Sequence, residues 1–333
     1  MPELPERPSN DEPGNFEDET GLQEVNSSED LGSRDGFMSV EEFFAQSSEE
    51  QLPPGFRSGF VSLMGRPNVG KSTLLNRILG RKVSIVSDKP QTTRNQIRGV
   101  LNRPSSQIVF VDTPGIHKPR TAMGERLNDA ALGSATAVDV VCLLVDATAP
   151  VGSGDQWVAD RVPSNAIIIV NKCDLVDSEA VMKQLLRASE FDRSAYFPIS
   201  AATGRGVDVL VDHLEGLMPE GPRWYPLDTV TDVEEAFWVA ELVREKLLAL
   251  THDELPHSIA CRVTEWDWPR VRCEILVERE SQKGIVIGKK GSVLKQVGIA
   301  ARAQMREGAF LELHVKVDRD WQRKAKSLDR LGY

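Results

Sequence analysis

Short apolar runs recur along the chain from about residue 59 onward and alternate with segments that suit helices. Four such runs span residues 60–64, 108–111, 140–145 and 166–170, and each is followed by a Gly, Asp or Asn. Because runs of this length are typical of strands buried on both faces, their alternation with helices predicts a parallel sheet covered on both sides. Ligands of such sheets bind at the carboxyl ends of the strands, so the polar residues after these runs are candidates for a site.

The stretch Pro219–Pro222 interrupts this pattern and indicates a linker. The apolar positions after it have first the spacing of a helix and then the alternation of strands. The expected order begins with a helix over residues 233–248 and two strands over residues 259–263 and 271–277. Two helices follow within residues 284–305, and a last strand spans residues 311–317. We therefore expect an α/β domain over residues 57–220, a linker over residues 221–231 and an α+β domain over residues 232–333.

The N-terminal residues 1–55 are rich in Glu, Asp, Pro, Ser and Gly and lack periodic apolar positions. Such a segment buries too little apolar surface to offset the entropy of ordering, so we expect an acidic disordered extension. Within it, Phe37–Gln46 is a candidate for a short docking helix. Residues 1–57 carry a net charge of −12, from 15 Asp and Glu against 3 Arg, whereas the whole chain carries −10. The remainder of the chain is therefore slightly basic.

The composition favours a soluble globular protein over membrane and disulfide-rich classes. No apolar run approaches the ~18 residues that a membrane-spanning helix needs. The acidic start does not resemble a secretory signal, and the four scattered cysteines suit a reducing compartment better than a disulfide framework or a zinc site. We expect a cytoplasmic monomer.

The sequence GRPNVGKST at Gly65–Thr73 has the spacing of a phosphate-binding loop between a strand and a helix. Its glycines let backbone N–H groups surround a β-phosphate, and the N-terminus of the following helix adds a favourable dipole. We expect Lys71 to reach the β- and γ-phosphates and Ser72 to supply a hydroxyl to Mg²⁺. The nucleotide-binding residues expected in this loop are Gly65, Arg66, Pro67, Asn68, Val69, Gly70, Lys71, Ser72 and Thr73.

A second motif, DTPG, ends the apolar run at residues 108–111. We expect Asp112 to hold Mg²⁺ through a water molecule and the backbone N–H of Gly115 to reach a γ-phosphate. The nucleotide contacts expected here are Asp112, Thr113, Pro114, Gly115 and Ile116.

The third motif, NKCD at residues 171–174, predicts that the base is guanine. The Asp174 carboxylate can accept hydrogen bonds from the N1–H and 2-amino groups of guanine, whereas adenine lacks these donors. We expect Asn171 to tie the loops together and to reach N7, and Lys172 to lie along the base. The expected contacts are Asn171, Lys172, Cys173, Asp174, Ser200 and Ala201, the last two through a backbone N–H near guanine O6. These strand-end motifs predict a domain that binds GTP and GDP.

The sequences GRPNVGKST, QTTR, DTPGIHKPR, NKCD and ISA resemble the motifs of the Era family of bacterial GTPases related to translation factors. LPHSIACRV and ERESQKGIVIGKKGSVLKQVG resemble the KH domain of that family. The resemblance runs from about Gly59 to Tyr333 and leaves the acidic extension outside it. It implies a P-loop GTPase domain with a mixed, mostly parallel sheet, followed by an α+β type II KH domain.

The same resemblance implies a function. A GTP-hydrolysing switch would bind small-subunit (16S) rRNA near its 3′ end and assist assembly of the 30S ribosomal subunit. Nothing in the residues themselves selects that RNA sequence.

The segment at residues 83–100 is expected to be a mobile loop that responds to the nucleotide. Similarity to related GTPases implies that Thr93, with Thr92 as the second choice, contacts Mg²⁺ and the γ-phosphate. The expected catalytic residues are Lys71, Thr93 and Gly115.

Hydrolysis without a partner is expected to be slow, because Ile116 stands where many GTPases carry a water-orienting Gln. Asn68 resembles a potassium ligand of some related GTPases, and a bound K⁺ would stabilise charge between the phosphates. We assign no role to His117.

The sequence GIVIGKKG at residues 284–291 predicts a KH loop, which clamps the backbone of about four nucleotides of single-stranded RNA. Its glycines permit close approach and its lysines meet phosphates. The expected RNA contacts are Ile285, Ile287, Gly288, Lys289, Lys290, Gly291 and Lys295.

Two other functions stay open at this point. One is a nucleotide-gated RNA-binding protein with negligible turnover, which Ile116 would suit. The other is a peripheral membrane GTPase at the inner face of the cell membrane, whose basic segment WQRKAKSLDR would touch anionic lipid.

Overall fold

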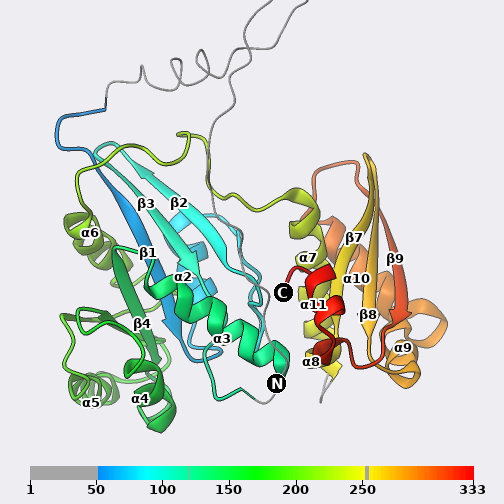
Figure 1. Cartoon of the computed structure of the whole chain (residues 1–333), viewed down its shortest axis with the longest axis horizontal. Helices are drawn as coiled ribbons and strands as arrows, with labels where there is room; N and C mark the ends of the chain where they lie inside the picture. The colour runs from blue at the N-terminus through cyan, green and yellow to red at the C-terminus, as the bar shows by residue number, and fades with distance from the viewer. Residues whose placement is uncertain (1–51, 120, 252–254) are drawn as a thin grey trace, which may run out of the picture. The chain divides into compact units, whose positions relative to one another are not determined.

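The computed structural model describes residues 52–119, 121–251 and 255–333. Residues 1–51 of the acidic extension, with the candidate docking helix at Phe37–Gln46, lie outside the described residues. Figure 1 shows the order of the elements along the chain.

Six of the described strands form one sheet, in the order β2-β3-β1-β4-β5-β6. All neighbouring pairs are parallel except β2 and β3, so the sheet is mixed and mostly parallel, as predicted. The elements of this part are β1 (Arg57–Gly65), α2 (Lys71–Leu79), β2 (Ile97–Arg103), β3 (Ser106–Asp112), α3 (Ala122–Ala135), β4 (Val140–Asp146), α4 (Ser153–Ala159), β5 (Ile167–Asn171), α5 (Ser178–Ser189), β6 (Ala195–Pro198) and α6 (Val207–Leu217).

Strand β2 was not predicted, and its first residues, 97–100, were assigned to the mobile loop at residues 83–100. Its sequence IRGVLNR lacks a continuous apolar run, and it pairs antiparallel with β3 as the edge strand among the described strands of this sheet. The α2–β2 loop therefore spans residues 80–96.

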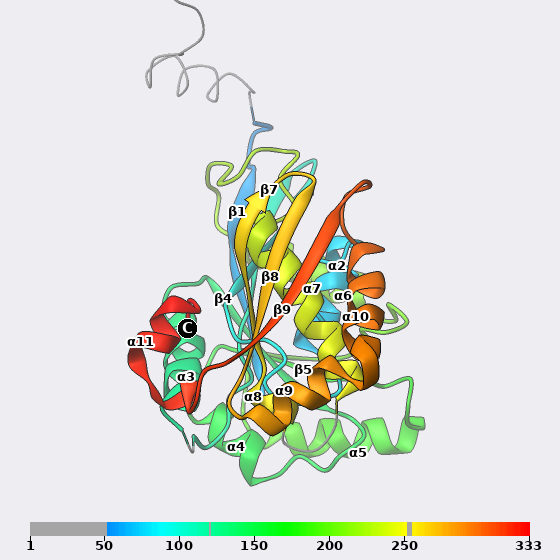
Figure 2. The ribbon, with the colours of Figure 1, turned by 90° about the vertical axis from the view of Figure 1, so that its right-hand side faces the viewer.

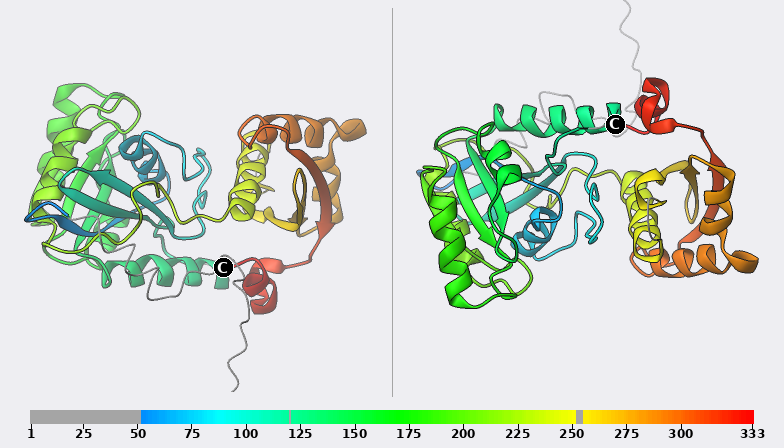
Figure 3. Two further views of the ribbon diagram at one scale, coloured as in Figure 1. Left: turned by 90° about the horizontal axis from the view of Figure 1, so that it is seen from above. Right: turned by 90° about the horizontal axis from the view of Figure 1, so that it is seen from below.

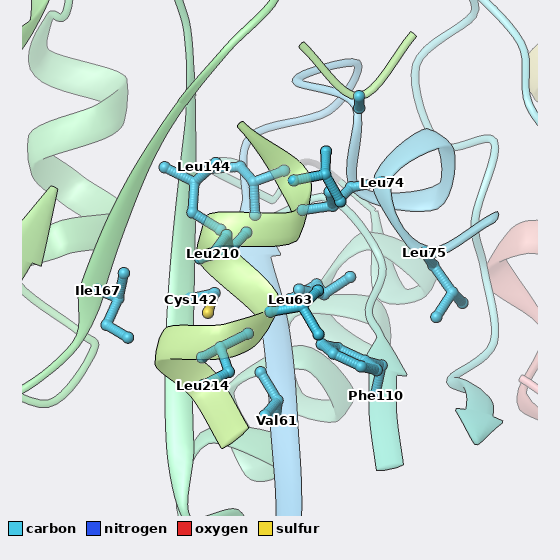
Figure 4. Close-up of a cluster of buried hydrophobic side chains, with 14 of the residues drawn as sticks. Val61, Leu63, Leu74, Leu75, Phe110, Cys142, Leu144, Ile167, Leu210 and Leu214 are labelled. Atoms are coloured by element: carbon cyan, nitrogen blue, oxygen red, sulfur yellow. The ribbon is translucent and has the colours of Figure 1, made fainter. Parts of the chain in front are cut away.

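Alternate residues of the central strands face opposite sides of the sheet, as the period of a strand requires. Cys142 and Leu144 join a buried cluster with α2 and α6, whereas Leu143 and Val145 join a second cluster with α3, α4 and α5. Figure 4 shows the first cluster, in which Leu210 and Leu214 of α6 lie over the strands. Burial on both faces explains why these strands are continuous apolar runs.

The register of the strands brings the predicted nucleotide residues to one edge of the sheet. Leu63 of β1 pairs with Asp112 of β3, and Asp146 of β4 pairs with Asn171 of β5. Because these strands are parallel, Asp112, Asp146 and Asn171 all stand at carboxyl ends, beside the loop that follows Gly65.

Three strands form the second sheet, in the order β7-β8-β9, with β8 antiparallel to β7 and parallel to β9. The elements of this part are α7 (Glu235–Leu250), α8 (Leu255–Ser258), β7 (Ala260–Asp267), β8 (Arg270–Val277), α9 (Glu280–Ile287), the 3₁₀ turn η1 (Lys289–Gly291), α10 (Ser292–Arg302), β9 (Phe310–Val317), the 3₁₀ turn η2 (Trp321–Arg323) and α11 (Ala325–Arg330). The predicted order is confirmed, with the short α8, η2 and α11 as additions.

Helices α7, α9 and α10 cover one face of this sheet (Figure 3). They share a buried core with the inward-facing residues of β7 and β8, among them Cys261, Cys273 and Ile275.

The segment at residues 221–231, predicted as a linker, runs back along β2 and β3. The Gln107 side chain donates a hydrogen bond to Tyr225 O at 2.7 Å, and the N–H of Val100 donates to Val230 O at 2.8 Å. These hydrogen bonds hold the segment against the first sheet.

Candidate nucleotide and RNA sites

The phosphate loop, Gly65–Thr73, connects β1 to α2 in a tightly packed conformation. Gly70 has a φ of 100°, and a Cβ atom at this position would lie 2.2 Å from Asn171 Nδ2. Only glycine fits there, since the left-handed backbone and the close amide both exclude a side chain. Helix α2 begins at Lys71, and the backbone N–H groups of its first turn lie at the phosphate loop, where they can bind an anion.

Lys71 is buried beneath the phosphate loop. Its ammonium donates hydrogen bonds to the backbone carbonyls of Gly65, at 3.3 Å, and Arg66, at 3.0 Å. Burial lowers the pKa of Lys71 to about 8, against the opposing attraction of the Asp112 carboxylate. A buried ammonium beside free backbone amides is well suited to bind an anionic phosphate.

Four oxygen-bearing side chains, from α2, β3 and the α2–β2 loop, meet beside the phosphate loop. Ser72 Oγ donates to Asp112 Oδ2 at 2.6 Å and lies 2.8 Å from Thr93 Oγ1, and Ser84 Oγ also donates to Asp112 Oδ2, at 2.9 Å. Burial raises the pKa of Asp112, although Lys71 and the hydroxyls oppose the shift. The second oxygen, Asp112 Oδ1, is buried without a hydrogen-bond partner among the described residues. This donor set fits Mg²⁺, which binds carboxylate, hydroxyl and water oxygens.

Thr92 and Thr93 differ in what their side chains contact. The Thr93 hydroxyl faces Ser72, whereas Thr92 Oγ1 donates to Lys89 O at 2.6 Å within the α2–β2 loop. The geometry favours Thr93 as the metal ligand, which was the first choice from sequence.

A pocket of about 450 Å³ opens at this position. Its walls are the phosphate loop, the residues of the α2–β2 loop from Ile85 to Thr93, Gly115 and Lys172. The size suits a nucleotide. Gln91 lines the pocket and was not predicted as a site residue, although it is the first residue of the QTTR sequence.

The DTPG motif packs directly against the phosphate loop. A Cβ atom at Gly115 would lie 2.7 Å from the Cα of Pro67, and the N–H of Ile116 donates to Gly65 O at 3.0 Å. The Ile116 side chain is fully buried in the second core cluster. It therefore faces away from the pocket, and it has no polar group with which to orient a water molecule. Thr113 is also buried and donates to Leu63 O at 2.7 Å.

Asn171 ties three loops together, as predicted. Its Nδ2 donates to Val69 O at 2.8 Å in the phosphate loop, and its Oδ1 accepts from the N–H of Ala201 at 2.9 Å. The N–H of Ser200 donates to Arg205 O at 2.9 Å. Because both amides have protein partners, a contact from either one to guanine O6 stays a prediction.

The neighbouring residues of NKCD are placed by contacts that sequence did not foresee. Lys172 Nζ pairs with Asp146 Oδ2 at 2.5 Å, at the end of β4. Asp146 was missed, although it follows an apolar run in the same way as Asp112. Asp174 is exposed, whereas the Cys173 side chain is buried and contacts Val170 O at 3.2 Å. Only the backbone of Cys173 is therefore available to a ligand.

The GKKG loop, Gly288–Gly291, connects α9 to α10. Gly288 has a φ of 73°, and a Cβ atom there would lie 2.5 Å from Val293 Cγ2, so glycine is required. The predicted lysines, Lys289, Lys290 and Lys295, are all exposed. Ile285 is 57% exposed and Ile287 is half-buried, so an aliphatic surface lies beside these cations. Charge and apolar surface are thus combined as single-stranded RNA requires.

The basic segment at residues 321–330 uses its apolar residues within the protein. Trp321 and Leu328 are buried in a cluster with Met123 and Leu127 of α3. Within the described ranges, no helix is long and apolar enough to cross a membrane.

Comparisons with known proteins agree with this geometry. Residues 60–172 match a family model described as 50S ribosome-binding GTPase, and residues 254–322 match a KH domain model. The GTPase Era of Mycobacterium leprae (strain TN) is 46% identical over 297 residues, which is 84% of this chain and 99% of that protein. The GTPase Era of Geotalea uraniireducens (strain Rf4) is 45% identical over 291 residues, which is 84% of this chain and 98% of that protein.

Solved structures extend the similarity to three dimensions. A crystal structure of Era in complex with MgGDPNP and nucleotides 1506–1542 of 16S ribosomal RNA has a TM-score of 0.80 and 37% identity, covering 84% of this chain and 99% of that one. An Aquifex aeolicus Era variant bound to GDP and AlF₄⁻ has a TM-score of 0.79 and 36% identity over the same shares. The chain belongs to the Era family of GTPases, with a P-loop GTPase domain followed by a KH domain.

Proposed function

We propose that this GTPase is a nucleotide-controlled switch that binds 16S rRNA near its 3′ end and assists assembly of the 30S ribosomal subunit. The observation that carries the proposal is a hydrogen bond from Arg244 of α7, which is fully buried, to the backbone carbonyl of Thr92. Thr92 directly precedes Thr93, whose hydroxyl meets Ser72 in the candidate metal site. The loop that GTP would order is therefore in contact with the KH domain, which offers a physical route between the two sites.

The residues around the pocket have defined roles in this proposal. Lys71 and the N–H groups of the phosphate loop bind the phosphates, and the N–H of Gly115 binds the γ-phosphate. Ser72 and Thr93 would hold Mg²⁺ directly and Asp112 would hold it through water. When bound, the ion neutralises charge on the β- and γ-phosphate oxygens.

Guanine selection rests on the residues at the ends of β4 and β5. The exposed Asp174 carboxylate accepts from the guanine N1–H and 2-amino groups. Asp146 holds the Lys172 ammonium, so the aliphatic part of that side chain is positioned to cover the base. Asn171 fixes the phosphate loop relative to these residues.

RNA binding is assigned to the GKKG loop and its neighbours. The support is the exposure of the lysines and Ile285, together with the Era relative whose solved structure contains 16S rRNA. We infer domain boundaries of 57–220 for the GTPase domain, 221–231 for the linker and 232–333 for the KH domain.

The test is the fluorescence anisotropy of a labelled single-stranded RNA that copies the 3′ end of 16S rRNA. Binding is compared at one fixed salt concentration with GDP and with a non-hydrolysable GTP analogue, because phosphate contacts make affinity salt-dependent. Tighter binding with the analogue supports the switch. Equal binding in both states would reduce the KH domain to a tether, and absence of binding would contradict the RNA assignment.

A second candidate function is a nucleotide-gated RNA-binding protein with negligible turnover, which the buried Ile116 favours. Because Ile116 carries no polar group that could orient water, the intrinsic rate depends on what other residues or a partner supply. Multiple-turnover GTPase assays with and without RNA separate the two functions, because only the first predicts sustained turnover when RNA is present.

A K⁺ site at Asn68 is a further part of the proposal. Asn68 has a φ of 64° and donates from Nδ2 to Asp88 O, so its side chain bridges the phosphate loop and the α2–β2 loop. Hydrolysis rates in matched potassium and sodium salts test it. Equal rates in the two salts would remove K⁺ from the mechanism.

We infer a cytoplasmic location, because ribosomal subunits are assembled there, and a monomeric state. Sedimentation velocity measures the oligomeric state directly. Association with membrane is tested by vesicle flotation of the full chain and of a variant that lacks residues 319–333.

A further inference from the structure

Three of the six tryptophans in the chain line one pocket that the function above does not use. Trp238 lies on α7, Trp266 lies near the end of β7, and Trp268 lies in the turn between β7 and β8; Trp266 and Trp268 are called the turn tryptophans below. The rings of Trp266 and Trp268 have centroids 6.3 Å apart, and Trp266 is 39% exposed. Large aromatic side chains usually bury most of their surface in a core, so exposed indoles at a pocket indicate a binding surface.

Cationic side chains surround these rings. The Arg306 guanidinium lies 4.3 Å from the centroid of the Trp268 ring, and Lys82 Nζ lies 5.9 Å from that of Trp238. Lys82 also donates to Glu245 and Gln304, whereas Arg81 is exposed at the rim. Of the described residues that line the pocket, only Glu235 is acidic. The pocket is therefore both aromatic and positively charged.

This combination matches an unpaired nucleotide of RNA. Any of the four bases can stack on an aromatic ring, and the phosphate next to the base is attracted to Arg and Lys. The volume of the pocket, about 420 Å³, accommodates a base with its ribose. A purely apolar ligand would make no use of the positive charges of Arg81 and Arg306, and an acidic peptide would make no use of the flat faces of the indoles.

The pocket lies at the opposite end of α10 from the GKKG loop. The loop precedes Ser292, and Gln304–Arg306 follow the last residue of the helix. Strand β9, which follows α10, runs beside β8 (Figure 2). At its start the N–H of Phe310 donates to Pro269 O of the β7–β8 turn at 2.8 Å. Eleven residues of helix separate the two ends by roughly 16 Å along the axis, so a strand must extend beyond the four nucleotides of a KH loop to reach both.

We propose that this tryptophan pocket is a second RNA subsite, which stacks an unpaired base on Trp266 and binds its phosphate through Arg306 and Arg81. The inference rests on the proposed RNA-binding function and adds a contact outside the GKKG loop. It gives the protein a longer footprint on single-stranded RNA.

The test uses the full chain and two labelled single-stranded RNAs from the 3′ end of 16S rRNA, one just long enough for the GKKG loop and one longer. Replacing both turn tryptophans, Trp266→Ala with Trp268→Ala, should weaken binding of the longer RNA by roughly 5- to 150-fold, as expected for one lost stacking contact. Binding of the short RNA should not change. Trp224→Ala is the matched control, because Trp224 is 54% exposed and lies outside the pocket.

Two further variants separate loss of fold from loss of contact and distinguish the two proposals. Trp266→Phe keeps an aromatic face and should retain most of the affinity for the longer RNA. If the variant with both turn tryptophans replaced binds that RNA like the parent while Lys289→Glu with Lys290→Glu does not, the pocket is no subsite and the KH assignment stands. If both bind normally, the KH assignment fails as well.

A direct contact is measured by photocrosslinking of 5-iodouridine-labelled RNA, followed by mapping of the crosslinked peptide. A crosslink within residues 266–268 supports the subsite. Crosslinks that map only to the GKKG loop would overturn the proposed subsite. Contact of the longer RNA with the GKKG loop and with no residue of the pocket would overturn it as well.

Discussion

Arg94 of the α2–β2 loop donates a hydrogen bond at 2.7 Å to the backbone carbonyl of Ile259, which directly precedes β7. The Arg94 side chain is almost fully buried, and its guanidinium lies 5.6 Å from the ring centroid of Trp321 and 5.7 Å from that of Tyr333. The residue next to the candidate metal ligand Thr93 is therefore anchored in the KH domain. Any movement of this loop must move or break these contacts, because a buried arginine cannot lose its partners without a large free-energy cost.

The first prediction concerns this anchor. Arg94→Ala should lower the ratio of RNA affinities measured with the GTP analogue and with GDP toward one, because it removes one of the arginine contacts between the loop and the KH domain, while the bond from Arg244 to Thr92 O remains. The variant should also lose about 1–3 kcal/mol of unfolding free energy, because Ile259 O is left without its donor. RNA anisotropy and chemical unfolding measure the two effects.

Arg98→Ala is the control for this variant. Arg98 lies on β2, and its ion pair with Asp232 at 2.9 Å is solvent-exposed, so its loss should leave the affinity ratio unchanged. A ratio in Arg94→Ala that equals the ratio of the parent would show that the two domains respond to nucleotide by another route.

The second prediction concerns the base. Asp174→Asn should weaken GTP by roughly 10- to 150-fold, because a charge-assisted pair of hydrogen bonds is lost, and should favour xanthosine nucleotides. Isothermal titration calorimetry with GTP and with XTP measures the two affinities. The nearby Asp177→Asn is a matched control: Asp177 caps α5 by accepting from the N–H of Ala180, and asparagine caps equally well. Unchanged GTP affinity in Asp174→Asn would remove this carboxylate from base recognition.

The third prediction concerns the GKKG loop. Lys289→Glu with Lys290→Glu should weaken RNA binding and lower the slope of log affinity against log salt by about 1.4, as expected for two lost phosphate contacts on a single strand. GDP affinity should stay the same. Lys183→Glu on α5, which is also exposed and lies far from the loop in sequence, is the control for a charge reversal outside the loop. A salt slope that did not fall would place the lysines outside the RNA contact.

The fourth prediction concerns pH. Burial acts to raise the pKa of Glu245, but hydrogen bonds from Lys246, Lys82 and the N–H of Val86 outweigh it and hold this pKa below its usual value. Since the folded pKa lies below the unfolded one, Glu245 stabilises the fold fully above the unfolded value, near 4.3, and loses that contribution as the pH falls through the folded pKa.

Unfolding free energies at pH 7 and near pH 4 measure this contribution. Glu245→Gln should lose stability at pH 7 and should show a smaller further loss on acidification than the parent. Glu307→Gln, at an exposed residue beyond α10, is the control for the removal of one carboxylate. Identical pH dependence in the parent and Glu245→Gln would mean that the carboxylate contributes nothing as a charge.

Much of the fold followed from local patterns. The runs that became β1, β3, β4 and β5 are continuous because both faces of each strand are buried, and that burial is visible in the residues themselves. The phosphate loop was also predictable from the sequence, since binding a nucleotide phosphate requires glycines, a lysine and a serine at fixed spacing. Strand β2 was not predicted, because this edge strand has no continuous apolar run.

The sequence by itself determined the class of both domains, the nucleotide motifs and the GKKG loop, because each depends on residues within a few positions of one another. Only the tertiary structure decided which of those residues meet. Asp146 pairs with Lys172, and Ser84 with Asp112, through strand register and loop packing. The tryptophan pocket gathers Trp238 with Trp266, and Arg94 reaches Ile259 across 165 positions. Such contacts are set by how helices and sheets pack, and no local spacing encodes them.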